Sequence, residues 1–179
     1  MHSTVIRWSC AAALTVAASA VMAQESDNRV GANTDWSVFE ETDPRQCWAV
    51  SSPKEVVNTR DGRVVAARRG EILLFVSFIP EDGVAGQVSF TGGYPFAGGS
   101  TVTVEVGDDT FELFTDSDVD PEWAWSASDE DDAAIIAAMK RGADAVLTGL
   151  SSRGTSTKDT FSLIGFTASV DEASARCNG

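Results

Sequence analysis

Short apolar runs separated by turn residues make up most of the chain. Trp36–Glu40 and Cys47–Ser51 alternate apolar and polar positions, which is typical of half-buried strands. The almost continuous apolar run Ile72–Ile79 lies between Gly70 and Pro80 and predicts a central buried strand. About nine or ten such runs, with turns roughly every 8 to 12 residues, predict an all-β antiparallel β-sandwich. A β-barrel is the alternative.

Residues 128–142 carry the clearest helical signal. Ser128 is a suitable N-cap, and four acidic residues after it place negative charge in the first turn. Two basic residues fall in the last turn, and Gly142 takes the position where a left-handed glycine commonly ends a helix. We expect residues 166–176 to form a short C-terminal helical segment that leads Cys177 back to the body of the domain.

Residues 1–23 have the pattern of a secretory signal peptide. Arg7 precedes a mostly apolar run, and small residues lead up to Ala23. The run is shorter than the roughly 20 apolar residues that a membrane span needs. We therefore expect cleavage after Ala23, a periplasmic or secreted protein, and no membrane insertion afterwards. Residues 24–34 are polar and predict a flexible lead-in, and residues 35–177 predict a single domain.

Cleavage would change which reactive side chains remain. It removes His2, the only histidine, and Cys10, and it leaves Cys47 and Cys177. In an oxidising compartment two cysteines most simply pair with each other, and two buried free thiols are the alternative. A chain without histidine has no Ser-His-Asp or Cys-His nucleophile pair and no histidine-bearing zinc site. We expect a non-enzyme without a cofactor.

Charge is strongly acidic and unevenly distributed. The chain has 27 acidic and 13 basic residues, a formal net charge of −14, which argues against nucleic acid as a partner. Six of the basic residues fall between Arg45 and Arg69, whereas none falls between Arg69 and Lys140. This pattern predicts a basic patch from the first hairpin and an acidic patch from the middle strands. Both would be either solvated faces or surfaces that steer a partner.

Three aspartates, Asp116, Asp118 and Asp120, lie two residues apart just past a predicted strand. Carboxylates at such spacing can hold a calcium ion. The EF-hand pattern fails, because Pro121 occupies the glycine position and Ala127 the position of the bidentate glutamate. The calcium site is therefore a weak hypothesis, and a solvated acidic loop is the alternative.

Four aromatic residues are candidate partner contacts. Tyr94 and Phe96 lie in a glycine-rich segment, where a wide turn would display both rings or fold them back as a lid on the core. Trp123 and Trp125 are two residues apart and so share one face of a strand. That face is either core or an exposed stacking platform for a sugar or peptide.

The C-terminal segment Lys158–Ala168 resembles the "SL-x-GF" signature of the invasion-associated locus B family. Further motifs agree with this family in order, so that the resemblance covers about residues 34–177: Asp35-Trp36, Cys47-Trp48-Ala-Val50 and the stretch Met139–Gly142. The resemblance implies a periplasmic or secreted sandwich of immunoglobulin-like type. It supplies no established reaction or ligand and no catalytic residues to carry over.

These observations together predict an exported, non-catalytic envelope or secreted protein. It would bind a protein or a glycan at the cell envelope or on a host surface. One alternative is a carboxylate-based hydrolase of envelope polysaccharide, with or without calcium, and another is a structural or stress-related envelope protein. A deep cleft with two buried carboxyl groups would favour the enzyme, whereas a shallow surface with exposed rings would favour binding.

Overall fold

The computed structural model describes residues 28–178. The expected signal peptide lies outside the described residues. The strands are β1 (Arg29–Asn33), β2 (Trp36–Thr42), β3 (Arg45–Ser51), β4 (Glu55–Arg60), β5 (Arg63–Val64), β6 (Leu73–Ile79), β7 (Val84–Thr91), β8 (Thr101–Val106), β9 (Asp109–Asp116), β10 (Asp120–Trp125), β11 (Asp144–Leu150) and β12 (Ser156–Ser162). The helices are a short 3-10 turn at Pro80–Asp82, α1 (Asp129–Arg141) and α2 (Phe166–Asn178).

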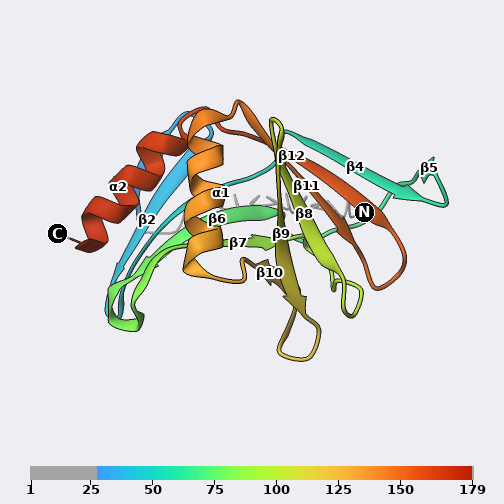
Figure 1. The fold of residues 1–179 in the computed structure, drawn as a ribbon, viewed down its shortest axis with the longest axis horizontal. Coiled ribbons are helices and arrows are strands. Elements are labelled where there is room, and N and C mark those ends of the chain that lie inside the picture. Colours follow the sequence, from blue (N-terminus) through green and yellow to red (C-terminus); the bar gives the residue numbers. More distant parts are fainter. Residues whose placement is uncertain (1–27, 179) are drawn as a thin grey trace, which may run out of the picture.

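The twelve described strands form one antiparallel sheet in the order β1-β2-β3-β6-β7-β10-β9-β8-β11-β12-β4-β5. This sheet folds over on itself (Figure 1). Phe90 on β7 and Phe161 on β12 have four strands between them in that order, yet their rings meet edge to face with centroids 6.2 Å apart. Trp36 on β2 also reaches across the core, where its Nε1–H donates to the carbonyl oxygen of Ser162 at 2.9 Å.

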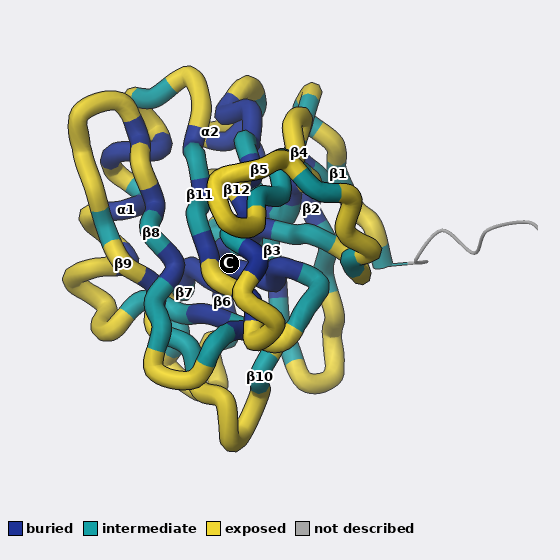
Figure 2. The backbone as a smooth tube through the Cα atoms, turned by 90° about the vertical axis from the view of Figure 1, so that its right-hand side faces the viewer, coloured by how far each residue is buried: buried dark blue, intermediate teal, exposed yellow. Residues whose placement is uncertain are grey.

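The all-β, sandwich-like class is therefore confirmed, with the added finding that the hydrogen-bonded ladder runs continuously from one layer to the other. Alternation explains the core: β6 buries every second residue, β3 does so from Cys47 to Ser51, and β2 does so at Trp36 and Val38. Figure 2 shows these buried positions gathered between the two layers, while the turns and the β4–β5 hairpin are exposed.

The N-terminal strand differs from the prediction. Residues 29–33 form β1 rather than part of a flexible lead-in, because they pair with β2 and Asn33 donates to Ser169 and Glu172 of α2. Their polar composition reflects the place of β1 at the edge of the sheet, where most of the strand stays partly or fully exposed.

Helix α2 closes one end of the N-terminal layer. Its buried side packs on β2, β3 and β6, and Phe166 meets Trp36 edge to face at 4.8 Å. Near its end, Cys177 is bonded to Cys47 of β3 with an S–S distance of 2.07 Å. The predicted disulfide is confirmed, and the C-terminal helix is two residues longer than expected.

Helix α1 begins and ends where the sequence predicts. The Ser128 hydroxyl accepts a hydrogen bond from the Asp131 N–H, as an N-cap should. The predicted reason for Gly142 is wrong, since its φ of −82° is not left-handed. A Cβ at Gly142 would lie 2.5 Å from Cγ1 of Val106, so the glycine is needed for close packing.

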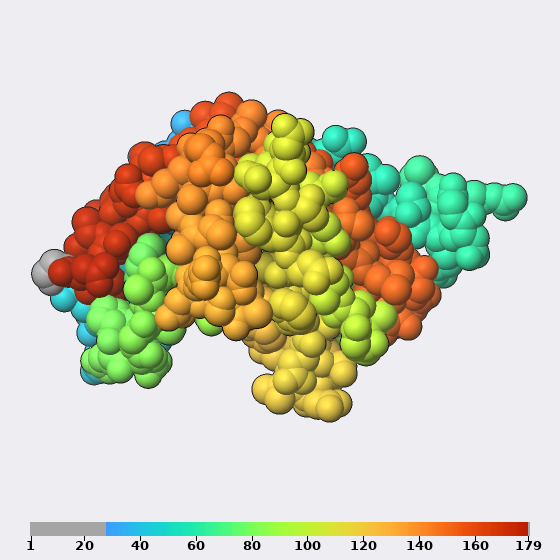
Figure 3. Space-filling view, viewed as in Figure 1, coloured from blue at the N-terminus to red at the C-terminus, as the bar shows by residue number. Residues whose placement is uncertain are grey.

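Two hairpins extend from the body in the space-filling view, the β9–β10 turn at the bottom and β4–β5 at the right (Figure 3). Within residues 28–178, no helix is long and apolar enough to cross a membrane.

Candidate functional site

A close approach of two glycines shapes one cavity of the described domain. The Gly70 N–H donates to the Gly93 carbonyl oxygen at 2.8 Å, and Gly93 has a φ of +70°. A Cβ on Gly93 would lie 2.7 Å from backbone atoms of Gly70. Only glycine satisfies both the positive φ and this spacing, which holds the segment 65–70 against the glycine-rich loop.

A buried ion pair locks that segment in place. Arg69 donates to both carboxylate oxygens of Asp159 on β12, each at 2.6 Å, and its Nε–H donates to the Gly92 carbonyl oxygen at 2.8 Å. The side chains of Arg69 and Asp159 are 5% and 0% exposed. Burial raises the pKa of Asp159, and the hydrogen bonds and charge of Arg69 oppose this rise.

Sequence reasoning missed this pair, although a signal was present. Thr157, Asp159 and Phe161 alternate on β12, so the pattern that buries Phe161 also turns Asp159 inward. A carboxylate on a core-facing position requires a cationic partner. The basic residues in the segment before β6 were the candidates for this cationic partner.

Tyr94 forms a wall of the cavity rather than an exposed loop tip. Its hydroxyl lies 2.6 Å from Oγ1 of Thr157, and the Arg69 guanidinium lies 5.0 Å from the centre of its ring. Burial raises the pKa of Tyr94. Phe96 is only 3% exposed and packs on Tyr94, so its prediction as a contact residue is wrong. Phe96 instead follows the alternative stated above, in which the ring folds back onto the core. The glycines of its loop allow this inward turn.

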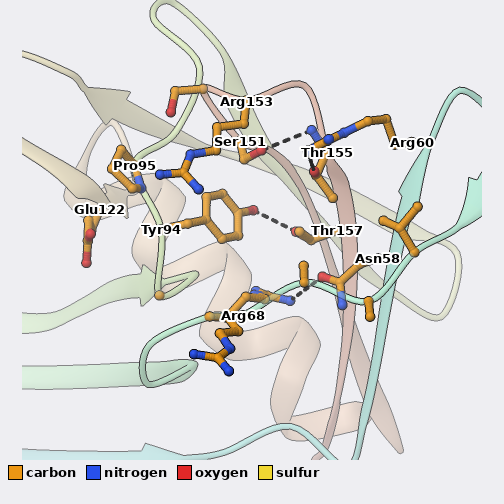
Figure 4. Close-up of a pocket in the computed structure, with 16 residues that line it drawn as sticks. Asn58, Arg60, Arg68, Tyr94, Pro95, Glu122, Ser151, Arg153, Thr155 and Thr157 are labelled. Atoms are coloured by element: carbon orange, nitrogen blue, oxygen red, sulfur yellow. Dashed lines mark hydrogen bonds between the residues drawn. The ribbon is translucent and has the colours of Figure 1, made fainter.

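The cavity has a volume of about 500 Å³, within the roughly 300–1,000 Å³ typical of small-molecule sites. Arg60, Arg68 and Arg153 lie around Tyr94 at its rim (Figure 4). Arg60 donates to Oγ1 of Thr155 at 2.6 Å. Among the described residues, Glu122 is the single carboxylate that lines the cavity. The paired carboxyl groups that a hydrolase would need are not brought together there.

The predicted calcium site is not assembled. Asp116 and Asp120 face each other across the β9–β10 turn, and Oδ1 of Asp116 accepts hydrogen bonds from the N–H groups of Asp118 and Val119. Within residues 28–178, no group of three or more potential ligands is placed to hold a metal ion. The Asp116 carboxylate instead stabilises the turn, which corrects the calcium hypothesis.

A second surface, which we call the aromatic face, lies on the side of the sheet opposite the helices. Trp123 and Trp125 stack with centroids 6.4 Å apart and planes at 17°, and Phe75 lies 5.4 Å from Trp123. All three are partly exposed, whereas Ala124, between the tryptophans, is fully buried. The two tryptophans therefore belong to the outer side of the sheet and not to its core.

Strand register extends the aromatic face sideways. Strand pairing places four residues in one row across the sheet, each opposite the next on the adjacent strand. The row runs Phe75, Ser89, Trp125 and Phe114. In the neighbouring row Phe39 stacks on Trp48 at 5.6 Å, and Trp48 is opposite Ser77. The helices pack on the opposite side, where Ile136 of α1 approaches Gly86 and Cys177 of α2 bonds to Cys47. Within the described residues, no helix covers the aromatic face.

The fold and these two surfaces define a disulfide-closed domain of the all-β, sandwich-like class. The chain belongs to the invasion associated locus B (IalB) protein family, which matches residues 36–174. The crystal structure of invasion associated protein B from Bartonella henselae is similar, with a TM-score of 0.57 and 17% identity over 83% of this chain and 98% of that one. No curated protein sequence matches the chain.

Proposed function

We propose that the protein is an exported, non-catalytic envelope or secreted protein that binds a glycan through its aromatic face. The observation that carries the proposal is the stacked pair Trp123–Trp125 on the outer side of the sheet. Nearly parallel, partly exposed indole rings offer flat, apolar surface with polar N–H edges. Such a platform matches the C–H face of a sugar ring, whose hydroxyl groups then point outward at the rim.

Polar side chains beside the platform favour a sugar over an apolar protein surface. Ser77 and Gln87 are opposite each other and partly exposed, and Ser77 is also opposite Trp48. These hydroxyl and amide groups offer hydrogen bonds next to the rings, which is the combination that a polyhydroxylated ligand needs.

A glycan array carrying bacterial envelope polysaccharides tests the proposal. We expect saturable binding that falls by up to about tenfold in Trp123→Ala and in Trp125→Ala, because the loss of one stacking ring removes on the order of 0.5–1.5 kcal/mol. Ile164→Ala is the matched control, since Ile164 is 62% exposed and does not belong to the aromatic face.

Two outcomes would contradict the proposal. One is the absence of binding to every glycan on the array by the folded protein. The other is binding that both tryptophan variants retain in full. Retention of a purified protein partner that depends on Trp125, without any glycan binding, would assign the aromatic face to protein docking instead.

A further inference from the structure

Basic side chains without an ion pair gather at one end of the molecule. Among residues 28–178, Lys54, Lys140, Arg141 and Arg176 each lie within 4.0 Å of a carboxylate oxygen. Five other described basic residues form no ion pair and lie on β4, β5, β12 or the segments beside them: Arg60, Arg63, Arg68, Arg153 and Lys158.

This clustering is unexpected for the composition. The chain has 27 acidic and only 13 basic residues, so an arginine side chain has many possible carboxylate partners. Nevertheless, three arginines without an ion pair line a cavity that includes the single carboxylate Glu122. The concentrated positive charge creates a local potential that attracts an anion, against the negative charge of the whole molecule.

The backbone holds two of these arginines toward the cavity. Arg60 ends β4, and its bond to Thr155 fixes the direction of its guanidinium while leaving other N–H groups free to donate. Arg153 lies on the β11–β12 turn, where the Ser152 N–H donates to the Pro95 carbonyl oxygen at 2.8 Å. Figure 4 shows Arg153 above Tyr94 and Arg60 above Thr157, with Arg68 on the other side of these two residues.

Part of the cavity lining is apolar, which favours a small organic molecule over an inorganic ion as the ligand. Val65, Ala66, Ala67 and Pro95 supply apolar surface, and the ring of Tyr94 lies among them. Arg69 donates its hydrogen bonds to Asp159 and to the Gly92 carbonyl oxygen. We therefore assign it to the wall of the cavity and not to ligand binding. A small molecule with a charged end and a less polar ring or chain satisfies both parts of the cavity.

We propose that this cavity binds an anionic group, carboxylate or phosphate, carried on a small organic body such as a sugar. The guanidinium groups of Arg60 and Arg153 donate charge-assisted hydrogen bonds to its oxygen atoms. Arg68 adds positive charge at the rim, and Glu122 opposes it. The site is independent of the proposed function, since it uses none of the residues of the aromatic face.

Calorimetric titration with D-glucuronate and with glucose 6-phosphate tests the site, with glucose as the neutral control. We expect saturable binding of at least one anion at millimolar concentration, and the comparison of the two distinguishes carboxylate from phosphate. Arg60→Gln and Arg153→Gln should each raise the Kd about tenfold or more, because each removes charge-assisted hydrogen bonds. Glu122→Gln should lower the Kd, because it removes a repelling charge.

Arg63→Gln is the matched control. It removes the same charge from an exposed arginine on β5 that does not line the cavity, and it should change the Kd less than twofold. The proposal fails if neither anion binds, if glucose binds equally well, or if Arg63→Gln weakens binding as much as the two cavity variants. Near-UV circular dichroism of each variant establishes that the fold is retained.

Discussion

Each of the two layers of the folded sheet contains a different kind of stabilising cross-link. In the N-terminal layer, formed by β1, β2, β3, β6, β7 and α2, a covalent bond between Cys47 and Cys177 joins helix to sheet. In the C-terminal layer, formed by β8, β9, β11, β12 and β4, the buried pair of Arg69 and Asp159 anchors the irregular segment before β6. The disulfide restricts the unfolded chain, whereas the ion pair specifies one position of a segment in the folded state.

This difference has a functional meaning. The disulfide lines neither candidate surface, because Cys47 and Cys177 are buried between β3 and α2, on the side of the sheet opposite the aromatic face. The ion pair lies directly behind the arginine-lined cavity and contacts Tyr94 through Arg69. We therefore expect the covalent link to determine stability alone, and the ion pair to determine both stability and the shape of the cavity.

Removal of the disulfide should have one of the two largest effects on stability, the other being the loss of Asp159. The bond joins residues 130 apart, and the chain-entropy relation gives about 5 kcal/mol for a loop of that length, an upper figure. The double variant Cys47→Ala/Cys177→Ala should lose about 2–5 kcal/mol of unfolding free energy in urea titrations and keep its anion affinity. A loss below about 1 kcal/mol would contradict the role of the disulfide.

Asp159→Ala is the other large effect, with an expected loss of about 3–5 kcal/mol, because it leaves the Arg69 guanidinium buried without a counter-charge. The matched control is Asp171→Ala, which removes a carboxylate that also lies 2.6 Å from its partner, Lys140, but is 61% exposed. That exposed pair should contribute about 0–1 kcal/mol.

The double variant Arg69→Met/Asp159→Leu should recover much of the stability, since apolar side chains need no counter-charge. It should not recover the cavity, because it lacks the bonds that hold Arg69 to the Gly92 carbonyl oxygen. Equal losses in Asp159→Ala and Asp171→Ala would remove the contrast between the layers.

The smallest effect concerns Asp132 of α1, a helix that contacts β7 and α2 in one layer and β9 in the other. Its Oδ1 accepts hydrogen bonds from the Val88 N–H at 2.6 Å and from the Ser126 hydroxyl. Burial raises the pKa of Asp132 above its ordinary value of 3.8. The folded state therefore holds the proton more tightly than the unfolded state does.

The stabilising contribution of protonated Asp132 is fully present below pH 3.8 and is lost as the pH rises through the folded-state pKa. Asp132→Asn keeps an oxygen for both hydrogen bonds and removes the titration, so its stability at pH 7 should lie within about 1 kcal/mol of wild type. The wild-type advantage over this variant should decrease with rising pH in the acid range, measured by urea unfolding. An increase would show that the charged form is the preferred one.

Local sequence patterns were sufficient to predict most of the secondary-structure elements and the fold class. The alternation in Trp36–Glu40 and Cys47–Ser51, the run Ile72–Ile79 and the capped segment 128–142 each express burial or capping that depends on near neighbours in sequence. The pairing of Cys47 with Cys177 followed from the expected removal of Cys10, without knowledge of distance.

Other features depended on which distant segments meet. The polar β1 becomes a strand because β2 and α2 supply partners for its backbone and for Asn33, and no local pattern contains them. Phe96 and Tyr94 are two residues apart, but the loop turns one ring into the core and leaves the other at the cavity. The spacing of Asp116, Asp118 and Asp120 could not reveal that one carboxylate is occupied by the turn.

The amino-acid sequence was sufficient to predict the all-β class, the position of α1 and the disulfide, and it contains the concentration of basic residues between Arg45 and Arg69. Each depends on composition, on periodicity or on the chemistry of a single residue type. The three-dimensional structure was needed to show that Asp159 neutralises Arg69 while Arg60, Arg68 and Arg153 line a cavity. It was also needed to show that Trp123 and Trp125 face outward. Charge pairing and the choice of sheet face are set by contacts between residues far apart in the chain, because burial is a property of the assembled layers.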